Sequence, residues 1–455
     1  MASTYLTRTP GSAGDRKTWT LSGWYKRSAN ASDYLLSSGQ YSSTQLSQIL
    51  FEGDDYFNVA FYSSGAALEG HLETNRKFRD PSAWYHIVVA MDTAQAGSSD
   101  RVKIYVNGVQ QTSFKTETYP AQDYETSINN NVAQNIGRRE GSGFYNGQMA
   151  HVHFCDGQAY AASDFGETDA TSGMWIAKTS PSVTYGTNGY FLKFSSGASG
   201  ADSSGNGNTM SVSGTLTNLK DGPDNNFPTW SPLYMPHTGV DPTFSNCNGT
   251  VVSQNGSGDY WGSASTLGMR SGKWYAEFKA VTASNKPSFG ITQSPTDHGY
   301  NEDYLGKDIY DYAYISDGGI YNNDSETAAW GNTFTAGDIV MVAVDLDNNK
   351  IYFGKNGTWQ NSGDPTSGAT GTGAAYTITS TTDSTAGMTA QGFYHFACSD
   401  QSTGSDTMDC NFGSGYFGTT AVSTSESDDA GIGSFEYDVP AGYYALCTTN
   451  LGDQS

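Results

Sequence analysis

Apolar and polar side chains alternate along short stretches of this chain, and clusters of Gly, Asn, Asp and Ser separate these stretches. In the segment 18–27 (TWTLSGWYKR), Trp19 and Leu21 alternate with threonines, which predicts a strand with one apolar and one polar face. Segment 84–91 is almost wholly apolar and predicts a strand that is buried on both faces. Long runs of helix-forming residues are missing, so the pattern indicates an all-β sandwich.

One strand–turn–strand pattern occurs twice. Residues 84–114 and 337–360 each contain an apolar run that ends in Asp, then a polar turn, the triplet Lys-Ile-Tyr and an Asn-Gly turn. A matching strand precedes each copy, at 18–27 and at 271–280. Asn-Gly favours a tight hairpin because both residues tolerate positive φ, as expected at Asn107-Gly108. The chain is therefore expected to form two tandem antiparallel β-sandwich domains of a jelly-roll-like kind.

The middle of the chain has the composition of a junction. Residues 195–209 are nearly all Gly, Ser, Asn and Asp, and 221–236 contain four prolines. We expect a first domain at 1–200, a junction at 201–239 and a second domain at 240–455. The clearest further strands are 147–154, 189–194, 273–280, 287–292, 310–315, 338–344, 350–353, 391–397 and 407–412, with 435–447 closing the second sheet and 159–166 as one short helix.

Charge and cysteine content restrict the partners and the compartment. With 46 acidic and 23 basic residues the net charge is −23, and no Lys/Arg stripe appears, which argues against nucleic acid as a partner. The acidity suits solubility and equally suits binding of a divalent cation. Five cysteines without a CxxC pair fit folding in a reducing cytoplasm, although Cys398 and Cys410 remain candidates for a cross-strand pair. No apolar stretch has the length of a signal core or a membrane span.

Several motifs resemble known families. WYHIVVAMDT, DRVKIYVNG and the segment 136–167 resemble a concanavalin-A-like, laminin-G-type lectin domain that is common in structural proteins of tailed phages. SGKWYAEF, FGIT, GDIVMVAVDLDNNKIYFGKNG and DCNFG resemble a SPRY-type sandwich, and the ending VPAGYYALCTTNL matches the same phage architecture. The resemblance implies the fold and a phage virion origin, but not a ligand, because lectin-like folds have many functions. Relatives often continue past CTTNL into further domains, whereas this sequence stops four residues later. Attachment to a particle is therefore expected to depend on one of the modules, a loop or a partner protein.

Glucanases share this sandwich, so pairs of carboxylates are candidate catalysts. Retaining members place two carboxylates on one strand face, about 5–5.5 Å apart. The nearest pairs here are Glu69 with Glu73 and Glu436 with Asp438, which lie in a polar segment and at a strand end, and we expect both to be solvated surface. His151 and His153 alternate on one strand without a third ligand nearby, which favours a sheet-surface pair over a metal site. The sequence therefore predicts no enzyme activity.

Two turns are candidate calcium sites. Asp54 and Asp55 share the turn FEGDDYF, and Asp202 precedes Gly205 and Gly207, which would let backbone carbonyls converge. The alternative is that both are ordinary turns, because Asp and Gly are common turn residues.

The segment 297–330 combines tyrosines with acidic residues. Sugar rings pack on aromatic faces while their hydroxyl groups need carboxylate or amide partners, and the same mixture suits protein interfaces. The candidate ligand-binding residues are Asp303, Tyr304, Asp308 and Trp330. Tyr310, Tyr312 and Tyr314 alternate, and are expected to line the core side of a sheet.

The preferred hypothesis is a non-enzymatic phage virion surface protein, made in the host bacterial cytoplasm. As a capsid decoration, a fibre or a tail-tip knob it would display lectin-like modules that attach to host-surface glycans, with many weak sites acting together. The expected partners are other virion proteins, a host glycan and further copies of the chain, for example in a trimer. No cofactor is required, and Ca²⁺ is the candidate ion. The alternatives are a polysaccharide-degrading tailspike-type enzyme and a purely structural cement protein.

Overall fold

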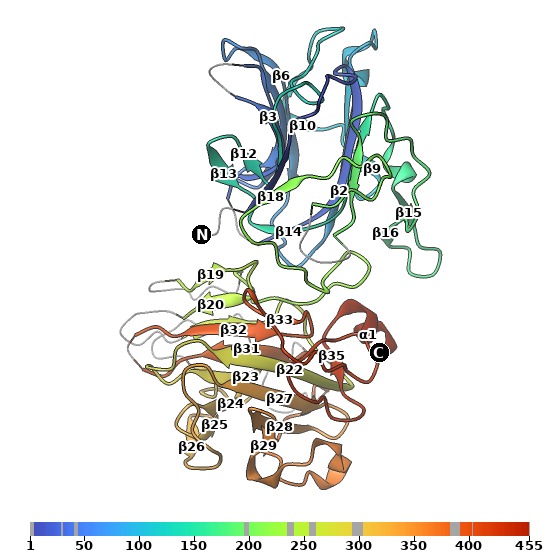
Figure 1. The fold of residues 1–455 in the computed structure, drawn as a ribbon. Coiled ribbons are helices and arrows are strands. Elements are labelled where there is room, and N and C mark those ends of the chain that lie inside the picture. Colours follow the sequence, from blue (N-terminus) through green and yellow to red (C-terminus); the bar gives the residue numbers. More distant parts are fainter. Residues whose placement is uncertain are drawn as a thin grey trace. The chain divides into compact units, whose positions relative to one another are not determined.

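The computed structural model describes residues 4–28, 31–40, 44–194, 200–233, 241–253, 261–293, 304–382, 392–402 and 404–454. The chain forms two compact units, Met1–Asn218 and Leu219–Ser455 (Figure 1). In the described residues the helical segments are α1 (Thr448–Asp453) and the 3₁₀ turns Ser98–Asp100, Ala162–Asp164, Gln360–Ser362 and Pro365–Thr370. None of these is long and apolar enough to cross a membrane. The remaining regular structure is β-strand, which confirms the all-β expectation.

The N-terminal unit is a sandwich of two antiparallel sheets. In its described part the larger sheet has the order β10 (Phe114–Thr118), β6 (Leu68–Lys77), β5 (Tyr56–Tyr62), β4 (Leu46–Phe51), β3 (Asp33–Gly39), β11 (Gln134–Ile136), β1 (Tyr5–Arg8), β18 (Ser211–Ser213). The smaller sheet has the order β17 (Tyr190–Leu192), β14 (Gly147–Asp156), β2 (Thr18–Arg27), β7 (Tyr85–Asp92), β8 (Val102–Val106), β9 (Val109–Gln110). Two small hairpins flank them: β12 (Arg138–Arg139) with β13 (Ser142–Phe144), and β15 (Gly166–Thr168) with β16 (Trp175–Ala177).

The core of this unit lies between the two sheets. The larger sheet contributes Ile49 and Val59, and the smaller one contributes Trp19 and Ile87, all fully buried. Strand β7 is buried on both faces as expected, since Val88 points into a second cluster with Cys155 and Phe165. The sheets therefore bury one apolar face against each other, as sandwich packing requires.

The polar face of β2 is buried, which alternation alone does not predict. Thr20 donates a hydrogen bond to the carbonyl of Gln158 (2.7 Å), and Ser22 pairs with His86 Nε2 (2.9 Å). The segment that contains β15 and β16 lies over this face, where Trp175 Nε1 donates to His86 Nδ1 (3.0 Å). Since Nδ1 accepts, the proton of neutral His86 sits on Nε2 and is donated to Ser22. Side-chain partners thus compensate the buried hydroxyl groups.

The boundary between the two units lies further along the chain than the start of the expected junction. Strand β18 pairs with β1 at the edge of the larger sheet, and Gly200 bridges Met210, so residues 200–213 belong to the first unit. The expectation that 189–194 is its last strand is therefore wrong. Trp230 lies in the core of the second unit, so its stretch is not a free linker.

The C-terminal unit is also built from two antiparallel sheets. In its described residues the larger sheet follows the order β19 (Thr243–Ser245), β20 (Thr250–Val252), β32 (Thr407–Asn411), β22 (Lys273–Ala280), β27 (Ile339–Asp345), β28 (Lys350–Lys355), β29 (Thr358–Trp359), with β30 (Tyr376–Thr377) on β28 and β35 (Tyr444–Ala445) on β22. The second sheet follows β21 (Trp261–Ala264), β31 (His395–Ser399), β23 (Ser288–Thr292), β24 (Tyr312–Ile315), β25 (Ile320–Asn322), β26 (Ser325–Thr327). A hairpin of β33 (Tyr416–Phe417) and β34 (Thr420–Ala421) completes it.

The C-terminal segment covers one face of the larger sheet instead of closing it. Within 435–447, β35 pairs parallel to β22, and Phe435 forms an isolated antiparallel bridge with Glu426. Phe435 and Tyr443 pack on Tyr275, which points away from the inter-sheet core. The expectation of a closing strand is therefore wrong for most of the segment, because Pro440 cannot donate to a ladder hydrogen bond. Cys398 and Cys410 lie in the inter-sheet core as free thiols, so the cross-strand disulfide does not form.

The repeated sequence pattern forms the same substructure in each unit. The sheet order β14-β2-β7-β8-β9 corresponds to β32-β22-β27-β28-β29. The two Asn-Gly turns have nearly equal φ values, 47° and 82° at Asn107-Gly108 and 46° and 82° at Asn356-Gly357. Each Asn side-chain oxygen accepts a backbone N–H at 2.8 Å from the strand next to its hairpin, from His86 on β7 or from Ile339 on β27. The sequence repeat is thus a repeat of strand order and turn geometry, and confirms the Asn107-Gly108 hairpin.

Candidate functional site

The predicted ligand residues of the C-terminal unit do not form one cluster. The Tyr304 hydroxyl donates to Asp324, and the Tyr304 ring meets Tyr321 edge-on at 6.0 Å. Asp308 is exposed, and its backbone carbonyl accepts the N–H of Asn323 (3.1 Å). These two residues therefore belong to a turn held against β25 and β26. Asp303 lies outside the described residues.

Trp330 is held in a different place. Its half-buried ring packs edge-on against Tyr314 (5.9 Å) and Phe353 (6.3 Å). Tyr312 and Tyr314 are core residues, as expected, and Tyr310 is buried as well. Most of the aromatic surface of this segment therefore stabilises the fold.

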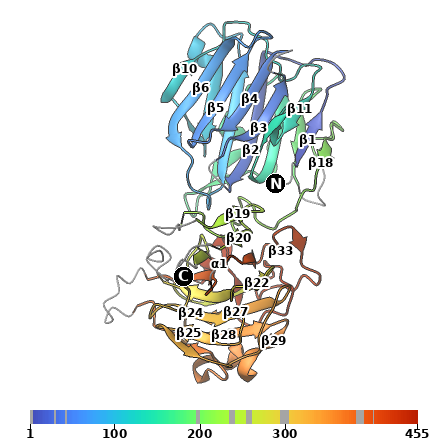
Figure 2. The same ribbon diagram turned by 90° about the vertical axis from the view of Figure 1, so that its left-hand side faces the viewer.

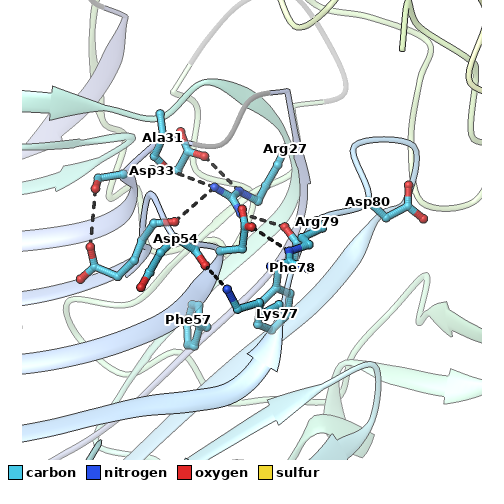
Figure 3. Close-up of polar contacts among 12 residues, drawn as sticks. Arg27, Ala31, Asp33, Asp54, Phe57, Lys77, Phe78, Arg79 and Asp80 are labelled. Atoms are coloured by element: carbon cyan, nitrogen blue, oxygen red, sulfur yellow. Dashed lines mark hydrogen bonds and ion pairs between the residues drawn. The ribbon is translucent and has the colours of Figure 1, made fainter. Parts of the chain in front are cut away.

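The Asp54-Asp55 turn is occupied by cationic side chains (Figure 3). Asp55 Oδ1 lies 3.3 Å from Arg27 Nη1, and Asp55 Oδ2 lies 3.1 Å from Arg79 Nε. Asp54 lies 3.4 Å from Lys115 Nζ, and its backbone carbonyl accepts from Lys77 Nζ (3.0 Å). N–H donors thus engage both carboxylate oxygens of Asp55 and one of Asp54, which are oxygens that a hard cation would need.

Arg27 ties three segments together beneath this turn (Figure 3). It pairs with Asp33 (3.1 Å) as well as with Asp55, and it donates to the carbonyls of Phe78 (2.8 Å) and Ala31 (3.0 Å). Burial raises the pKa of Asp33 to about 6, although the charge of Arg27 and the N–H of Asn146 oppose the shift. The network is a buried structural anchor.

Asp202 has a comparable role in its own turn. Its Oδ1 accepts the backbone N–H groups of Phe191 (2.9 Å) and Ser204 (2.8 Å), and its Oδ2 accepts that of Asn208 (2.7 Å) and the Ser204 hydroxyl (2.9 Å). Burial opposes ionisation, but these hydrogen bonds outweigh it and lower the pKa of Asp202. Among the described residues, no group of three or more His, Cys, Asp or Glu side chains is arranged to hold a metal ion. Calcium binding stays a prediction.

The histidine pair is separated by a bulge. Positive φ at His151 (48°) accompanies a register shift between Ala150 and His153. His153 is buried, stacks on Phe191 at 4.0 Å and pairs with the Tyr185 hydroxyl (2.9 Å). Burial lowers its pKa well below the usual value. His153 is therefore a neutral packing residue, and the expected surface position is wrong for it.

The structure reveals a polar array that the sequence analysis missed, on the outer face of the larger sheet of the N-terminal unit. Figure 2 shows β6, β5 and β4 side by side, with this face towards the viewer and no described segment in front of them. The strand registers place Glu73 opposite Asn58, and His71 opposite Ala60, whereas Val59 and Leu72 point into the core. We call the following residues the outer-face cluster: Glu52, Asp54, Tyr56, Asn58, His71, Glu73 and Lys115.

Asn58 connects two members of this cluster. Its Nδ2 donates to Glu52 Oε1 (2.8 Å) and lies 2.9 Å from His71 Nε2. Because an amide nitrogen only donates, His71 Nε2 must accept, and the proton of neutral His71 sits on Nδ1. Burial lowers the pKa of His71, which favours this neutral form. The side chain of Asn58 is thereby fixed in one orientation.

Lys115 connects the remaining members. Its Nζ lies 3.0 Å from Glu73 Oε1 and 4.1 Å from the centre of the Tyr56 ring. The second oxygen of Glu73 accepts from Thr116 Oγ1 (3.2 Å). The hydrogen bond that Lys115 donates to Glu73 raises the pKa of Lys115, whereas burial raises the pKa of Glu52. Glu73, expected to be solvated surface, has a mostly buried carboxylate in this cluster.

Sequence signals for the cluster exist but are weak. Polar residues alternate with core residues at Asn58-Val59 and at His71-Leu72-Glu73, which indicates only one polar strand face. Lys115 reaches the same place through the pairing of β10 with β6. Only the strand register reveals that these residues meet.

Comparisons with known proteins match both units. Residues 2–163 match a family described as "Concanavalin A-like lectin/glucanases superfamily", of the laminin G type, and residues 273–389 match the SPRY domain family. No curated protein matches the chain.

Solved structures give similar relatives. The SPRY domain of human HERC1 is 18% identical, with a TM-score of 0.29, and the match covers 40% of this chain and 96% of that one. A heptameric SAP-like pentraxin from Limulus polyphemus is 11% identical, with a TM-score of 0.28 and coverage of 39% and 86%. A human SPRY domain is 15% identical, with a TM-score of 0.25 and coverage of 36% and 90%. The two family matches thus find a concanavalin A-like, laminin G-type domain over residues 2–163 and a SPRY domain over residues 273–389.

Proposed function

We propose that this chain is a non-enzymatic glycan-binding protein, displayed on the surface of a tailed-phage virion to attach it to host-surface glycans. The observation that carries the binding role is the outer-face cluster. A sheet face normally exposed to water here holds carboxylates and an amide in a fixed hydrogen-bonded array, next to the ring of Tyr56. Fixed polar groups combined with aromatic surface suit recognition of a hydroxyl-rich ligand.

The virion part of the proposal rests on the sequence motifs. The repeated hairpin, the SPRY-type motifs and the ending VPAGYYALCTTNL together resemble phage structural proteins. On this proposal other virion proteins hold the chain, and several copies act together, for example as a trimer. Weak single sites then suffice, because multivalency raises the overall affinity.

The contacts of the candidate carboxylates support a role without catalysis. Both oxygens of Glu73 accept hydrogen bonds, from Lys115 and from Thr116. Both oxygens of Glu436 accept from Ser423. A catalytic pair needs one protonated acid and one base or nucleophile facing the same bond. Carboxylates whose two oxygens both accept hydrogen bonds from the protein do not favour that arrangement.

The test is a glycan-array and host-cell binding assay on the purified chain, with and without EDTA, together with an assay for release of reducing ends. We expect saturable binding that survives chelation, and no release of sugar. Binding that is lost with EDTA would direct attention to a calcium site. Sugar release would favour the depolymerase alternative. Absence of binding in both conditions would refute the proposal and favour a structural cement protein.

A further inference from the structure

The orientation of Asn58 leaves its carbonyl oxygen without a partner. The ionised carboxylate of Glu52 can only accept, so Nδ2 and not Oδ1 must face it. Nδ2 then uses both hydrogens, on Glu52 and on His71. Asn58 is only 5% exposed, and its Oδ1 has no hydrogen-bond partner in the described part of the protein. An unsatisfied buried acceptor costs about 1–3 kcal/mol, so a donor is expected to bind there.

Two more amide oxygens on the same sheet face are in the same condition. Gln48 lies opposite Ala60 on one side and Ser37 on the other, and Ser37 lies opposite Asn135. Gln48 Oε1 and Asn135 Oδ1 are buried and have no hydrogen-bond partner within the described residues. Asn135 Nδ2 faces a carboxylate oxygen of Glu140 at 3.4 Å, which again turns the amide oxygen away from it. Strands β5, β4 and β11 thus carry acceptors that need donors, with β3 lying between β4 and β11.

The charges around Asn58 disfavour an anionic ligand. The outer-face cluster contains the carboxylates of Glu52, Asp54 and Glu73. The ammonium group of Lys115 contacts Glu73 and Asp54, and that of Lys77 contacts the carbonyl of Asp54 and the Tyr56 ring. The lysines are therefore engaged, and three negative charges face two positive ones. A ligand carboxylate would meet acceptors and like charge.

We propose that the outer-face cluster, together with Gln48 and Asn135, forms a sugar subsite that accepts hydroxyl or ammonium donors and therefore selects neutral or amino sugars over sugars that carry carboxylates. The inference rests on the proposed glycan-binding function and specifies its ligand class and its location in the N-terminal unit. In the complex, hydroxyl or ammonium donors of the ligand supply the hydrogen bonds that the buried amide oxygens lack.

The test uses Asn58→Leu and Gln48→Met, which keep the side-chain volume but remove the acceptor. The matched control is Gln110→Met, on an exposed position of β9 in the other sheet. The purified full-length variants are titrated with neutral, amino and uronic-acid oligosaccharides of equal length, and circular dichroism checks folding. We expect about tenfold weaker binding of neutral and amino sugars for both variants, which corresponds to one lost hydrogen bond. The control is expected to bind like the wild type.

The outcomes separate this inference from the proposed function. If the wild type binds no glycan, both fail. If it binds glycans but uronic acids bind as tightly as neutral sugars, or if both folded variants bind like the wild type, only the subsite is refuted. Gln48→Met keeps the inference testable if Asn58→Leu does not fold, because Gln48 lies outside the Glu52–Asn58–His71 contacts. Binding of a Lys/Arg-rich peptide in place of every sugar would also overturn it.

Discussion

Replacement of Arg27 by Met tests the buried network beneath the Asp54-Asp55 turn. Met has a similar volume but neither charge nor donors. The change removes an ion pair at 3.1 Å to Asp33 and another at 3.3 Å to Asp55, and it leaves the carbonyls of Phe78 and Ala31 without their donor. Asp33 is 0% exposed, so water cannot replace the guanidinium.

The expected cost follows from burial. Breaking a buried ion pair by removing one partner destabilises a protein by about 3–5 kcal/mol, since the remaining charge is uncompensated. Asp55 retains Arg79, so the loss falls mainly on Asp33. For a unit of this size, each kcal/mol shifts the melting temperature by about 2–4 °C. Arg27→Met is therefore expected to lower the Tm of the N-terminal unit by about 6–20 °C.

Calorimetry of the full chain measures this shift, and hydrogen exchange in β3 and β4 locates it. Arg79→Ala is the matched control, because Arg79 contacts the same Asp55 while its side chain is 63% exposed, and its loss is expected to cost at most about 1 kcal/mol. The double variant Arg27→Met/Asp33→Asn is expected to recover part of the loss, since it removes the stranded charge. The reasoning fails if Arg27→Met costs less than about 1 kcal/mol, or if both single variants cost the same.

Acidification from about pH 7 to about pH 4.5 is expected to weaken glycan binding, because protonation of His71 and Glu52 breaks the contacts that orient Asn58. Burial lowers the pKa of His71 and raises the pKa of Glu52. An affinity that does not change with pH would contradict this. Burial raises the pKa of Glu277 from 4.5 to about 7 in the C-terminal unit, although hydrogen bonds from the backbone N–H groups of residues 436 and 437 oppose the shift. The folded state then holds this proton more tightly than the unfolded state. The proton adds on the order of 3 kcal/mol to the free energy of unfolding below about pH 4.5, and this contribution is lost as the pH rises through 7. Glu277→Gln should flatten the pH dependence of denaturant unfolding, and an unchanged slope would refute the assignment. Asn107→Ala is expected to lower the free energy of unfolding in urea by about 1–2 kcal/mol, because Ala disfavours positive φ and lacks the side-chain acceptor. Asn107→Gly loses only the acceptor and is expected to cost less. Equal losses for the two variants would show that φ is not the cause.

The strands and their turns were largely predictable because their signals are local. The expected strand 273–280 coincides with β22, and 84–91 differs from β7 by one residue at each end. Asn107-Gly108 adopts the predicted hairpin because no more than two residues must accept positive φ. Predictions failed where tertiary contacts decide. The short helix expected at 159–166 is the single 3₁₀ turn Ala162–Asp164, and the segment 435–447 packs on a sheet face.

The candidate calcium and ligand residues show a similar division. The sequence placed Asp55 and Asp202 in turns; Asp55 lies in a bend, whereas Asp202 forms a β-bridge with Leu192 and precedes its turn. Whether an aspartate is open to an ion depends on what lies beside it. Here Arg27 comes from another strand, and the backbone donors to Asp202 come from β17 as well as from the segment that follows Asp202.

The sequence by itself determined the all-β class, the two units and the repeated hairpin, since alternation and turn propensity act over a few neighbouring residues. Only the tertiary structure decided that Glu52, Asn58, His71 and Lys115 meet on one sheet face. Strand register sets which side chains lie opposite each other, and it is fixed by packing of the whole core. The single orientation of the Asn58 amide, and hence the unpartnered oxygen that defines the proposed subsite, follows from contacts that no local pattern encodes.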